Sequence, residues 1–204
     1  MGDGMRERPI LMTPENAQKC HDGTKTQTRR TNGLKKVNGS GPWDYPQMQS
    51  SGIAIFLDST QANPYNNALE VTCPYGVVGD RLWVREALCR NGSVMTYLDG
   101  SPVMQGDLVM PSWCERKTIR SIHMPRFACR TELEITEVRV ERLKDISPAD
   151  ALAEGVFCPE VGYAQHGERA PVLLYGFLWE SIHGAGSWAL NPWVWVISFR
   201  KVGA

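Results

Sequence analysis

The chain has 204 residues, of which 42% are hydrophobic and 22% are charged, and its formal net charge is zero. A chain of this length buries roughly 70% of its unfolded surface, so it can fold as one domain without a disulfide or a structural metal. Proteins that coat nucleic acid by counterion release usually present a net basic surface, so the charge balance excludes that mode and leaves only local contacts with nucleic acid.

Neither a membrane segment nor a metal motif is predicted. No run approaches the about 18 apolar residues of a spanning helix, and the start, MGDGMRERP, is too charged for a signal peptide. The cysteines (20, 73, 89, 114, 129 and 158) form no CxxC pair, and the histidines lie far apart. We therefore expect a cytoplasmic protein with reduced cysteines, no contact with a membrane, no metal and no cofactor.

The first elements expected are a short strand over 8–12 and a helix that begins at Thr13-Pro14-Glu15 and ends at Gly23. Threonine is a favoured N-cap, proline is favoured at the first helical position, and glycine readily adopts the left-handed conformation that ends a helix.

A strand over 26–30 is expected next. Its alternation places Thr28 and Arg30 on one face and Arg29 on the other. Lys25 joins the Arg29 face if the strand extends back to it, and it can meet Thr28 only if it still belongs to the turn.

Two polar segments on either side of a further strand are interpreted as surface insertions. Residues 31–67 are rich in Gly, Asn, Ser and Pro, and only 53–57 is apolar enough for a strand. The strand over 81–86 alternates, with Leu82 and Val84 on one face and Arg81, Trp83 and Arg85 on the other. Residues 90–118 form the second insertion, with a hairpin around Asp99-Gly100.

The second half predicts one long strand, two helices and a buried final strand. In the strand over 133–143, Leu133, Ile135 and Glu137 alternate with Glu134, Thr136 and Val138. Ser147 is the N-cap of a helix that ends at Gly155, 157–170 is a loop, and 172–182 is an apolar helix. Residues 193–199 are apolar on both faces, as in a central strand. These elements predict an α+β fold, a small mixed β-barrel with short flanking helices and loop insertions.

Basic residues gather in two stretches of the sequence. Lys19, Lys25, Arg29, Arg30, Lys35 and Lys36 form the first, and Arg116, Lys117, Arg120, Arg126 and Arg130 form the second. They are either two solvated faces or two strips that converge on one anionic ligand.

The pattern Gly23-x-Lys25-x-x-x-x-Arg30 resembles the signature of ASCH domains, a family of the PUA-like superfamily. CPYGVVGDRLWVREA (73–87) and the segments 121–147 and 191–199 are similar to longer ASCH-related proteins of tailed phages and prophages. The resemblance implies a PUA-like barrel over 1–204, as a single domain with insertions near 31–67, 90–118 and 157–170. A phage-encoded protein would act in the cytoplasm of its bacterial host.

The family also implies an activity, because its small bacterial members remove the acetyl group from N4-acetylcytidine. Their catalytic lysine and threonine match Lys25 and Thr28, and their glutamate matches Glu154. A lysine in an apolar cleft can act as a base toward a threonine hydroxyl, and a buried glutamate can pass a proton to the leaving nitrogen. From spacing alone, a charged and solvated strand edge is the favoured interpretation of Lys25 and the arginines.

The expected partner is a modified nucleoside or single-stranded RNA or DNA. The candidate binding residues are Arg29, Arg30, Trp83, Arg85, Glu86, His123 and Arg126. For Trp83 and His123 a purely structural role is the alternative, and Trp179, Trp193, Trp195 and Phe199 are interpreted as core. Three functions stay open: a hydrolase acting on an acylated cytidine, a non-catalytic reader of RNA or a modified base, and a ribonuclease.

Overall fold

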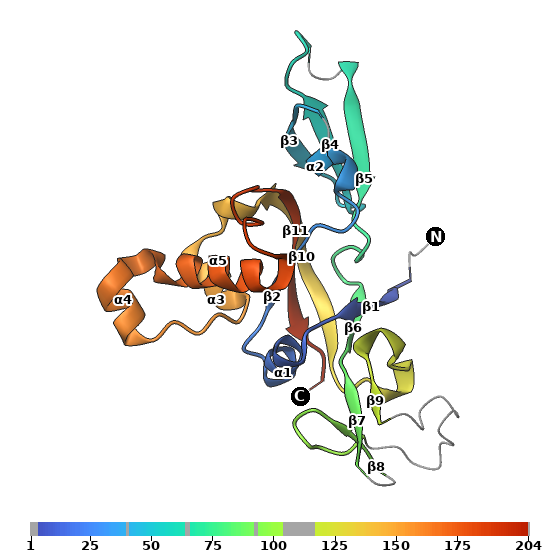
Figure 1. The fold of residues 1–204 in the computed structure, drawn as a ribbon. Coiled ribbons are helices and arrows are strands. Elements are labelled where there is room, and N and C mark those ends of the chain that lie inside the picture. Colours follow the sequence, from blue (N-terminus) through green and yellow to red (C-terminus); the bar gives the residue numbers. More distant parts are fainter. Residues whose placement is uncertain (1–3, 40, 64–65, 92–93, 104–116, 204) are drawn as a thin grey trace.

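The computed structural model describes residues 4–39, 41–63, 66–91, 94–103 and 117–203. A five-stranded sheet with the order β1-β6-β10-β11-β2 runs through the centre of the molecule (Figure 1). Its strands are β1 (Glu7–Leu11), β2 (Gln27–Arg30), β6 (Arg81–Arg85), β10 (Glu132–Arg142) and β11 (Trp193–Lys201). β1 and β6 are parallel and the other neighbours are antiparallel, so the sheet is mixed.

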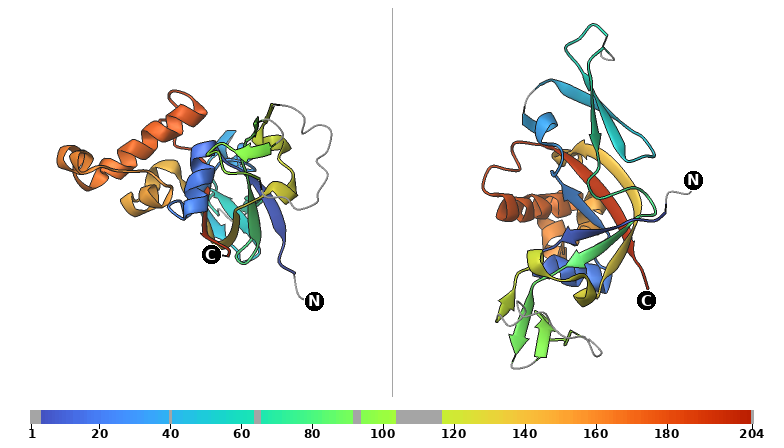
Figure 2. Two further views of the ribbon diagram at one scale, coloured as in Figure 1. Left: turned by 90° about the horizontal axis from the view of Figure 1, so that it is seen from below. Right: turned by 90° about the vertical axis from the view of Figure 1, so that its right-hand side faces the viewer.

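Two small antiparallel sheets extend from opposite ends of the central sheet (Figures 1 and 2). The first consists of β3 (Trp43–Met48), β4 (Ile53–Asp58) and β5 (Ala68–Thr72). The second consists of β7 (Leu88–Asn91), β8 (Val94–Tyr97) and β9 (Thr118–Ile119). The turn predicted at Asp99-Gly100 follows β8, where the Gly100 amide donates to the Tyr97 carbonyl over 3.0 Å.

The helices are short, and α3, α4 and α5 lie on one side of the central sheet (Figure 1). The α-helices are α1 (Pro14–Asp22), α2 (Lys35–Gly39), α3 (Pro148–Ala153), α4 (Glu160–His166) and α5 (Ala170–His183). Single 3-10 turns cover Ser121–His123, Arg126–Ala128, Leu143–Asp145 and Gly167–Arg169. Within the described ranges, no helix is both long and apolar enough to cross a bilayer.

β11 is buried on both faces because two separate hydrophobic clusters meet on it. Trp195 and Ile197 point into the larger cluster, which they share with residues of β1, β6 and β10. Val194 and Val196 point the other way and pack in a second cluster with residues of α3 and α5. The side chains on the two faces of β2 therefore enter different surroundings.

The local signals around α1 are confirmed. Thr13 accepts a hydrogen bond from the Asn16 amide at 3.3 Å, and Pro14 starts the helix. Gly23 ends it in the left-handed region with φ of 78°. Ser147 is likewise the N-cap of α3, accepting from the Asp150 amide at 3.0 Å.

The predicted alternation along β10 holds only for its first half. Leu133 and Ile135 are buried as expected, but the pairing with β11 shifts register between Ile135 and Glu137. A bulge adds one residue to one strand and reverses the faces beyond it. Consequently Val138, and not Glu137, packs against the same core as Leu133.

Two segments interpreted as loops contain regular structure. The segment 31–67 includes α2 and β3 besides the predicted strand, and 157–170 includes α4. In β3, Pro46 interrupts the strand pattern, and the pairing with β4 shifts register between Asp44 and Gln47. A proline at a bulge is tolerated in a strand but hides it from an alternation-based prediction.

The α+β class is confirmed, whereas a closed barrel is not seen among the described strands. No ladder joins β1 to β2, so the described central sheet is open at these two edges. A side chain spans the gap: Arg30 Nη2 of β2 donates to the Leu11 carbonyl of β1 at 2.8 Å.

Candidate functional site

Lys25 lies in the connection between α1 and β2 and is buried, with 3% of its surface exposed. The Lys25 amide donates to the Lys19 carbonyl and the Thr26 amide to the Ala153 carbonyl, so the connection is held between α1 and the end of α3. Lys25 Nζ contacts Glu154 twice, at 2.6 Å to Oε2 and 2.7 Å to the carbonyl oxygen. Two residues far apart in sequence thus form a buried ion pair.

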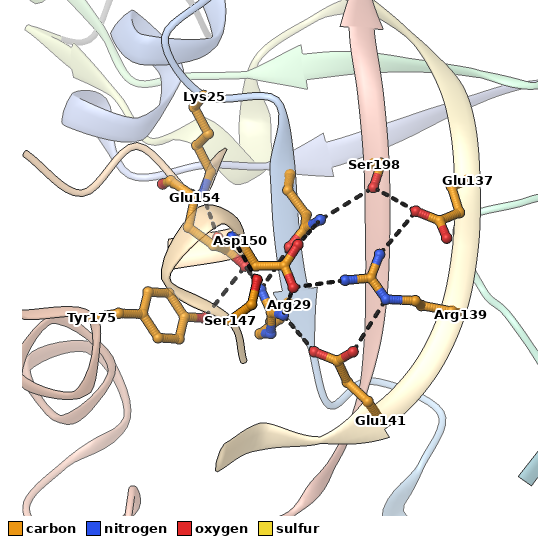
Figure 3. Close-up of polar contacts among 11 residues, drawn as sticks. Lys25, Arg29, Glu137, Arg139, Glu141, Ser147, Asp150, Glu154, Tyr175 and Ser198 are labelled. Carbon is orange, nitrogen blue, oxygen red and sulfur yellow. Dashed lines mark hydrogen bonds and ion pairs between the residues drawn. The ribbon is translucent and has the colours of Figure 1, made fainter. Parts of the chain in front are cut away.

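Glu154 directly follows α3 as its C-cap residue, and its amide donates to the Asp150 carbonyl. Its carboxylate is as buried as the lysine and receives two further donors: Arg29 Nη1 at 3.3 Å and the Tyr175 hydroxyl at 3.4 Å (Figure 3). Because a buried carboxylate is costly unless its lone pairs are satisfied, these donors hold Glu154 in one position.

Gly155 permits the close approach of the lysine to the end of α3. It has φ of 82°, and a Cβ built there would lie 3.0 Å from Lys19 Cδ and 3.2 Å from Lys25 Cβ. Lys19 Nζ also donates to the Gly155 carbonyl at 2.8 Å. Both the backbone angle and the space favour glycine at this point.

Arg29 connects the ion pair to a larger charged network on the α3 side of the sheet (Figure 3). Its side chain is fully buried and forms ion pairs with Glu141 and, at 3.4 Å, with Asp150. Arg139 pairs with the same two carboxylates. The connected charged side chains are Lys25, Arg29 and Arg139 on the cationic side and Glu137, Glu141, Asp150 and Glu154 on the anionic side. The cations of this network are therefore neutralised internally.

Tyr175 and Asp150 are among the groups bonded in this network whose pKa values are shifted. Burial, followed by the negative charge of Glu154, raises the pKa of Tyr175 well above its usual value, so the phenol stays protonated and donates to Glu154. Burial alone would raise the pKa of Asp150, but the hydrogen bond from Gln27 and the charges of Arg139 and Arg29 outweigh it and lower that pKa.

A cavity of about 80 Å³ lies at the outer edge of β2 between α1 and α5. It is lined by Thr13, Asn16, Lys25, Thr28, Arg29, Arg30, Glu154, Tyr175, Leu178, Trp179, Ile182 and His183. Because β2 is an edge strand, residues from both of its faces can border one cavity there. The predicted catalytic residues Lys25, Thr28 and Glu154 all line it.

The predicted contact between Lys25 and Thr28 is not formed. In the part of the chain that the structure describes, no hydrogen bond joins the two residues, and both hydrogen bonds of Lys25 Nζ go to Glu154. Lys25 does belong to the turn, as that contact requires, because β2 begins only at Gln27. Its amine is nevertheless directed to the carboxylate.

Most of the predicted binding residues lie away from this cavity. Trp83 shares the half-exposed face of β6 with Arg85, as predicted, and is flanked by two guanidinium groups, Arg85 at 5.2 Å and Arg126 at 5.7 Å from the ring centroid. Arg126 also pairs with Glu7 and Glu132. None of these side chains borders the cavity, whereas Arg29 and Arg30 do.

Glu86 and His123 are also outside the cavity. Glu86 is buried and accepts two hydrogen bonds from Arg130, at 2.9 and 3.0 Å. Arg130 in turn bonds Gln18 of α1 and Asp99, so this pair ties the segment after β8 to α1. His123 lies exposed in a 3-10 turn. Of the second basic stretch, Arg116 lies outside the described residues, as do Glu115 and Cys114.

The sequence-based interpretation missed the contribution of α5 to the site. Tyr175, Trp179 and His183 recur every four residues and therefore share one helix face, which borders the cavity. Trp179 is core, as predicted, and also part of the cavity wall. The spacing of the three aromatic residues is the signal that marks this face. Within the described residues, no cluster of three or more His, Cys, Asp or Glu side chains could hold a metal ion.

Two solved structures resemble the chain over nearly its whole length. One is a protein of Enterococcus faecalis V583 assigned to DUF984, with a TM-score of 0.40 and 10% identity, covering 99% of this chain and 83% of that one. The other is an ASCH domain from Lactobacillus crispatus JV V101, with a TM-score of 0.37 and 13% identity, covering 97% and 79%. The chain matches no protein-family model and no curated protein.

The chain is therefore distantly similar in structure to an ASCH domain and to a DUF984 protein. TM-scores this low give no support for a shared activity or a shared set of site residues. Neither of the two proteins is described as phage-encoded, and a phage origin stays a prediction.

Proposed function

We propose that the chain is a single ASCH-type, PUA-like domain that removes an acyl group from a modified cytidine, with N4-acetylcytidine as the model substrate. The observation that carries this proposal is the buried ion pair of Lys25 and Glu154 in the wall of a cavity that Thr28 also lines. An amine, an alcohol and a carboxylate are the groups that hydrolysis of an amide requires.

The arrangement suggests a division of roles. Glu154 accepts the proton of the attacking hydroxyl, from Thr28 or from water, and returns it to N4 of the base as the C–N bond breaks. The Lys25 ammonium lies beside the carboxylate and stabilises the negative charge that develops on the acyl oxygen. With water as the attacking group the products are cytidine and acetate; with Thr28 the acetyl group is first transferred to the hydroxyl as cytidine leaves, and one water then hydrolyses this ester to acetate and free Thr28.

This scheme differs from a lysine–threonine dyad because Lys25 Nζ bonds Glu154 and not Thr28. Tyr175 and Arg29 act as positioning residues, since each donates to Glu154 Oε1 and holds the carboxylate toward the lysine. A carboxylate fixed by several donors needs little reorganisation during the reaction.

The first prediction concerns the carboxylate. Glu154→Gln keeps the size of the side chain but removes the proton acceptor, so turnover of N4-acetylcytidine should fall by about 10²-fold or more. The measurement is the release of acetate and cytidine, followed by chromatography and mass spectrometry.

Glu141→Gln is the matched control, because Glu141 also pairs with Arg29 but does not line the cavity. It should retain turnover within a few-fold of the wild type. A wild-type protein that converts no acylated cytidine, or equal losses in the two variants, would contradict the proposed reaction.

A second candidate function is a non-catalytic reader of RNA or a modified base. The observation that favours it is the lack of any hydrogen bond between Lys25 and Thr28 in the described chain, so the lysine–threonine dyad that the resemblance implies is not formed. A reader binds N4-acetylcytidine and leaves the mass of the ligand unchanged after prolonged incubation, whereas the hydrolase removes the acetyl group and lowers that mass accordingly.

A further inference from the structure

A second and larger cavity adjoins the first. Its volume is about 390 Å³, and it lies between the β2–α2 connection and the segment that follows α5. Its wall consists of Thr31, Lys35, Asn38, Gly39, Trp179, His183, Ser187, Leu190 and Pro192. Trp179 and His183 border both cavities and stack on each other, with ring centroids 4.0 Å apart. The stacked Trp179–His183 pair thus forms a shared wall between two cavities of different size.

The sizes of the two cavities bear on the ligand. Sites for ligands of drug size usually span about 300–1,000 Å³, so the cavity of about 80 Å³ at Lys25 holds only a small part of a nucleoside. The remainder of such a ligand has to extend over the mouth of the cavity. The adjoining cavity at His183, with a volume of about 390 Å³, is large enough for this remainder.

The charges around the two cavities favour an anion in the larger one. Lys25 and Arg29 are neutralised by carboxylates. Arg30 in the first cavity and Lys35 in the second form no ion pair with any carboxylate of the described chain. Arg30 instead bonds the Leu11 carbonyl and the Met12 sulfur. Each of the two adjoining cavities is therefore bordered by a cation without a counter-charge.

Buried polar atoms without partners lie in the same walls. Trp179 is 4% exposed, and its Nε1 has no hydrogen-bond partner among the described residues. The same holds for Arg30 Nε and for the hydroxyl of Ser187, which lines the larger cavity. Buried donors are normally satisfied, so unpaired ones beside a cavity mark positions where a ligand or water supplies the acceptor.

His183 contributes a neutral surface between the two cavities. Burial, followed by the charge of Arg30, lowers the pKa of His183, so its ring is uncharged near neutral pH. Stacked on Trp179, it offers a flat face of the kind on which nucleobases and sugars pack.

We propose that the two cavities form one site for a phosphorylated nucleoside, as a mononucleotide or within a single strand. The modified edge of the base enters the cavity at Lys25 and Glu154, the nucleoside crosses the Trp179–His183 pair, and a phosphate binds at Lys35. This inference rests on the proposed function for the identity of the base, and it assigns the substrate class as a nucleotide and not a free nucleoside.

Binding of unreactive products tests the inference without turnover. Cytidine, cytidine 5′-monophosphate, cytidine 3′-monophosphate and the trinucleotide CpCpC are titrated calorimetrically into the wild-type protein. At least one monophosphate should bind about tenfold more tightly than cytidine, as expected for a hydrogen bond to a charged group. If CpCpC binds more tightly than either monophosphate, the natural ligand is a single strand. If CpCpC and the better monophosphate bind equally tightly, the natural ligand is a mononucleotide.

Lys35→Ala is the test variant and Lys36→Ala the matched control, since both lysines are exposed neighbours on α2 but only Lys35 borders the cavity. Lys35→Ala should remove most of the preference for the monophosphates over cytidine. For CpCpC, it should also reduce the slope of log Kd against log salt concentration by about 0.7. Lys36→Ala should change neither.

The inference is overturned if cytidine and its phosphates bind equally, if no phosphorylated probe binds, or if the two lysine variants lose the same affinity. Its failure can be told apart from failure of the proposed reaction. Turnover of N4-acetylcytidine without any preference for phosphate removes the inference alone. A preference for phosphate that depends on Lys35, without turnover of any acylated cytidine, removes the reaction alone.

Discussion

Lys25 and Glu154 bury two opposite charges, and this has a cost that their mutual attraction alone does not offset. Desolvation costs several kcal/mol per ion in order of magnitude, and it is recovered only when further hydrogen bonds satisfy both groups. Here Lys25 has a second bond to the Glu154 carbonyl, and the carboxylate has Arg29 and Tyr175. Apolar side chains of similar volume often stabilise a fold as well as such a pair does, so a functional role explains its presence better than stability does.

Asp150 provides a prediction at the residue scale. Its pKa is lowered in the folded state, so its contribution to stability is present above the ordinary value of 3.8 and is lost as the pH falls through the lower folded value. Asp150→Asn removes the ion pairs to Arg139 and Arg29 and should lower the free energy of unfolding at pH 7 by about 1–3 kcal/mol.

Urea denaturation at a series of pH values measures this effect. The difference between Asp150→Asn and the wild type should shrink as the pH falls from 3.8 toward the lower folded pKa, because the carboxyl group of the unfolded chain takes up a proton in this range while that of the folded chain stays ionised. A difference that stays constant down to the acid transition would show that Asp150 stabilises the fold by packing and not by charge.

At the scale of elements, the site depends on how the end of α3 meets the start of β2. The Thr26 amide donates to the Ala153 carbonyl, and Gly155 leaves room for Lys25. Gly155→Ala combines the strain of a positive φ with a contact against the lysine, whereas Gly23→Ala at φ of 78° meets nothing within 4 Å.

Gly155→Ala should therefore destabilise the protein by about 1 kcal/mol more than Gly23→Ala, which itself costs about 1 kcal/mol for the left-handed backbone. It should also reduce turnover, because the added methyl group displaces Lys25 from Glu154. Chemical denaturation measures the free energy of unfolding of the two variants, and acetate release measures their turnover. Equal losses of stability with unchanged turnover in Gly155→Ala would mean that the backbone at 155 does not position the lysine.

Elements with strong local signals were predicted well from the sequence. Thr13 and Gly23 mark the ends of α1 because capping is decided by the residues themselves. β3 and the second half of β10 were not predicted correctly, since Pro46 and the bulge after Ile135 break the alternation on which strand prediction depends. A bulge is set by pairing with a neighbouring strand, which the local pattern does not contain.

At the scale of the whole molecule, the candidate site combines segments that are distant in the chain. Lys25 and Glu154 are separated by 129 positions, and no local spacing relates them. Their association was predicted from the ASCH resemblance, whereas the third wall of the cavity, on α5, was not predicted at all. Trp83 and Arg85 share a half-exposed face of β6, which is typical of a binding surface, yet Arg85 and Arg126 of a later 3-10 turn both pack on Trp83 away from the cavity.

The two small sheets project from opposite ends of the central sheet (Figures 1 and 2). The wall residues of the first cavity, in contrast, lie at the outer edge of β2 and on α1 and α5. The site therefore draws on the central sheet, α1, α3 and α5, and the wall residues of the first cavity include none from β3, β4, β5, β7, β8 or β9. This arrangement separates the Lys25–Glu154 cavity from the two small sheets.

A crystal structure of the Glu154→Gln variant with N4-acetylcytidine 5′-monophosphate tests the central claim most directly, because the variant retains the shape of the site but should not consume the ligand. We expect the acetyl end of the base within hydrogen-bonding distance of Lys25 Nζ, the nucleoside against His183, and the phosphate beside Lys35. A ligand bound elsewhere, for example at the cavity bordered by Arg8 and Asp80, with the Lys25 cavity empty, would contradict the account.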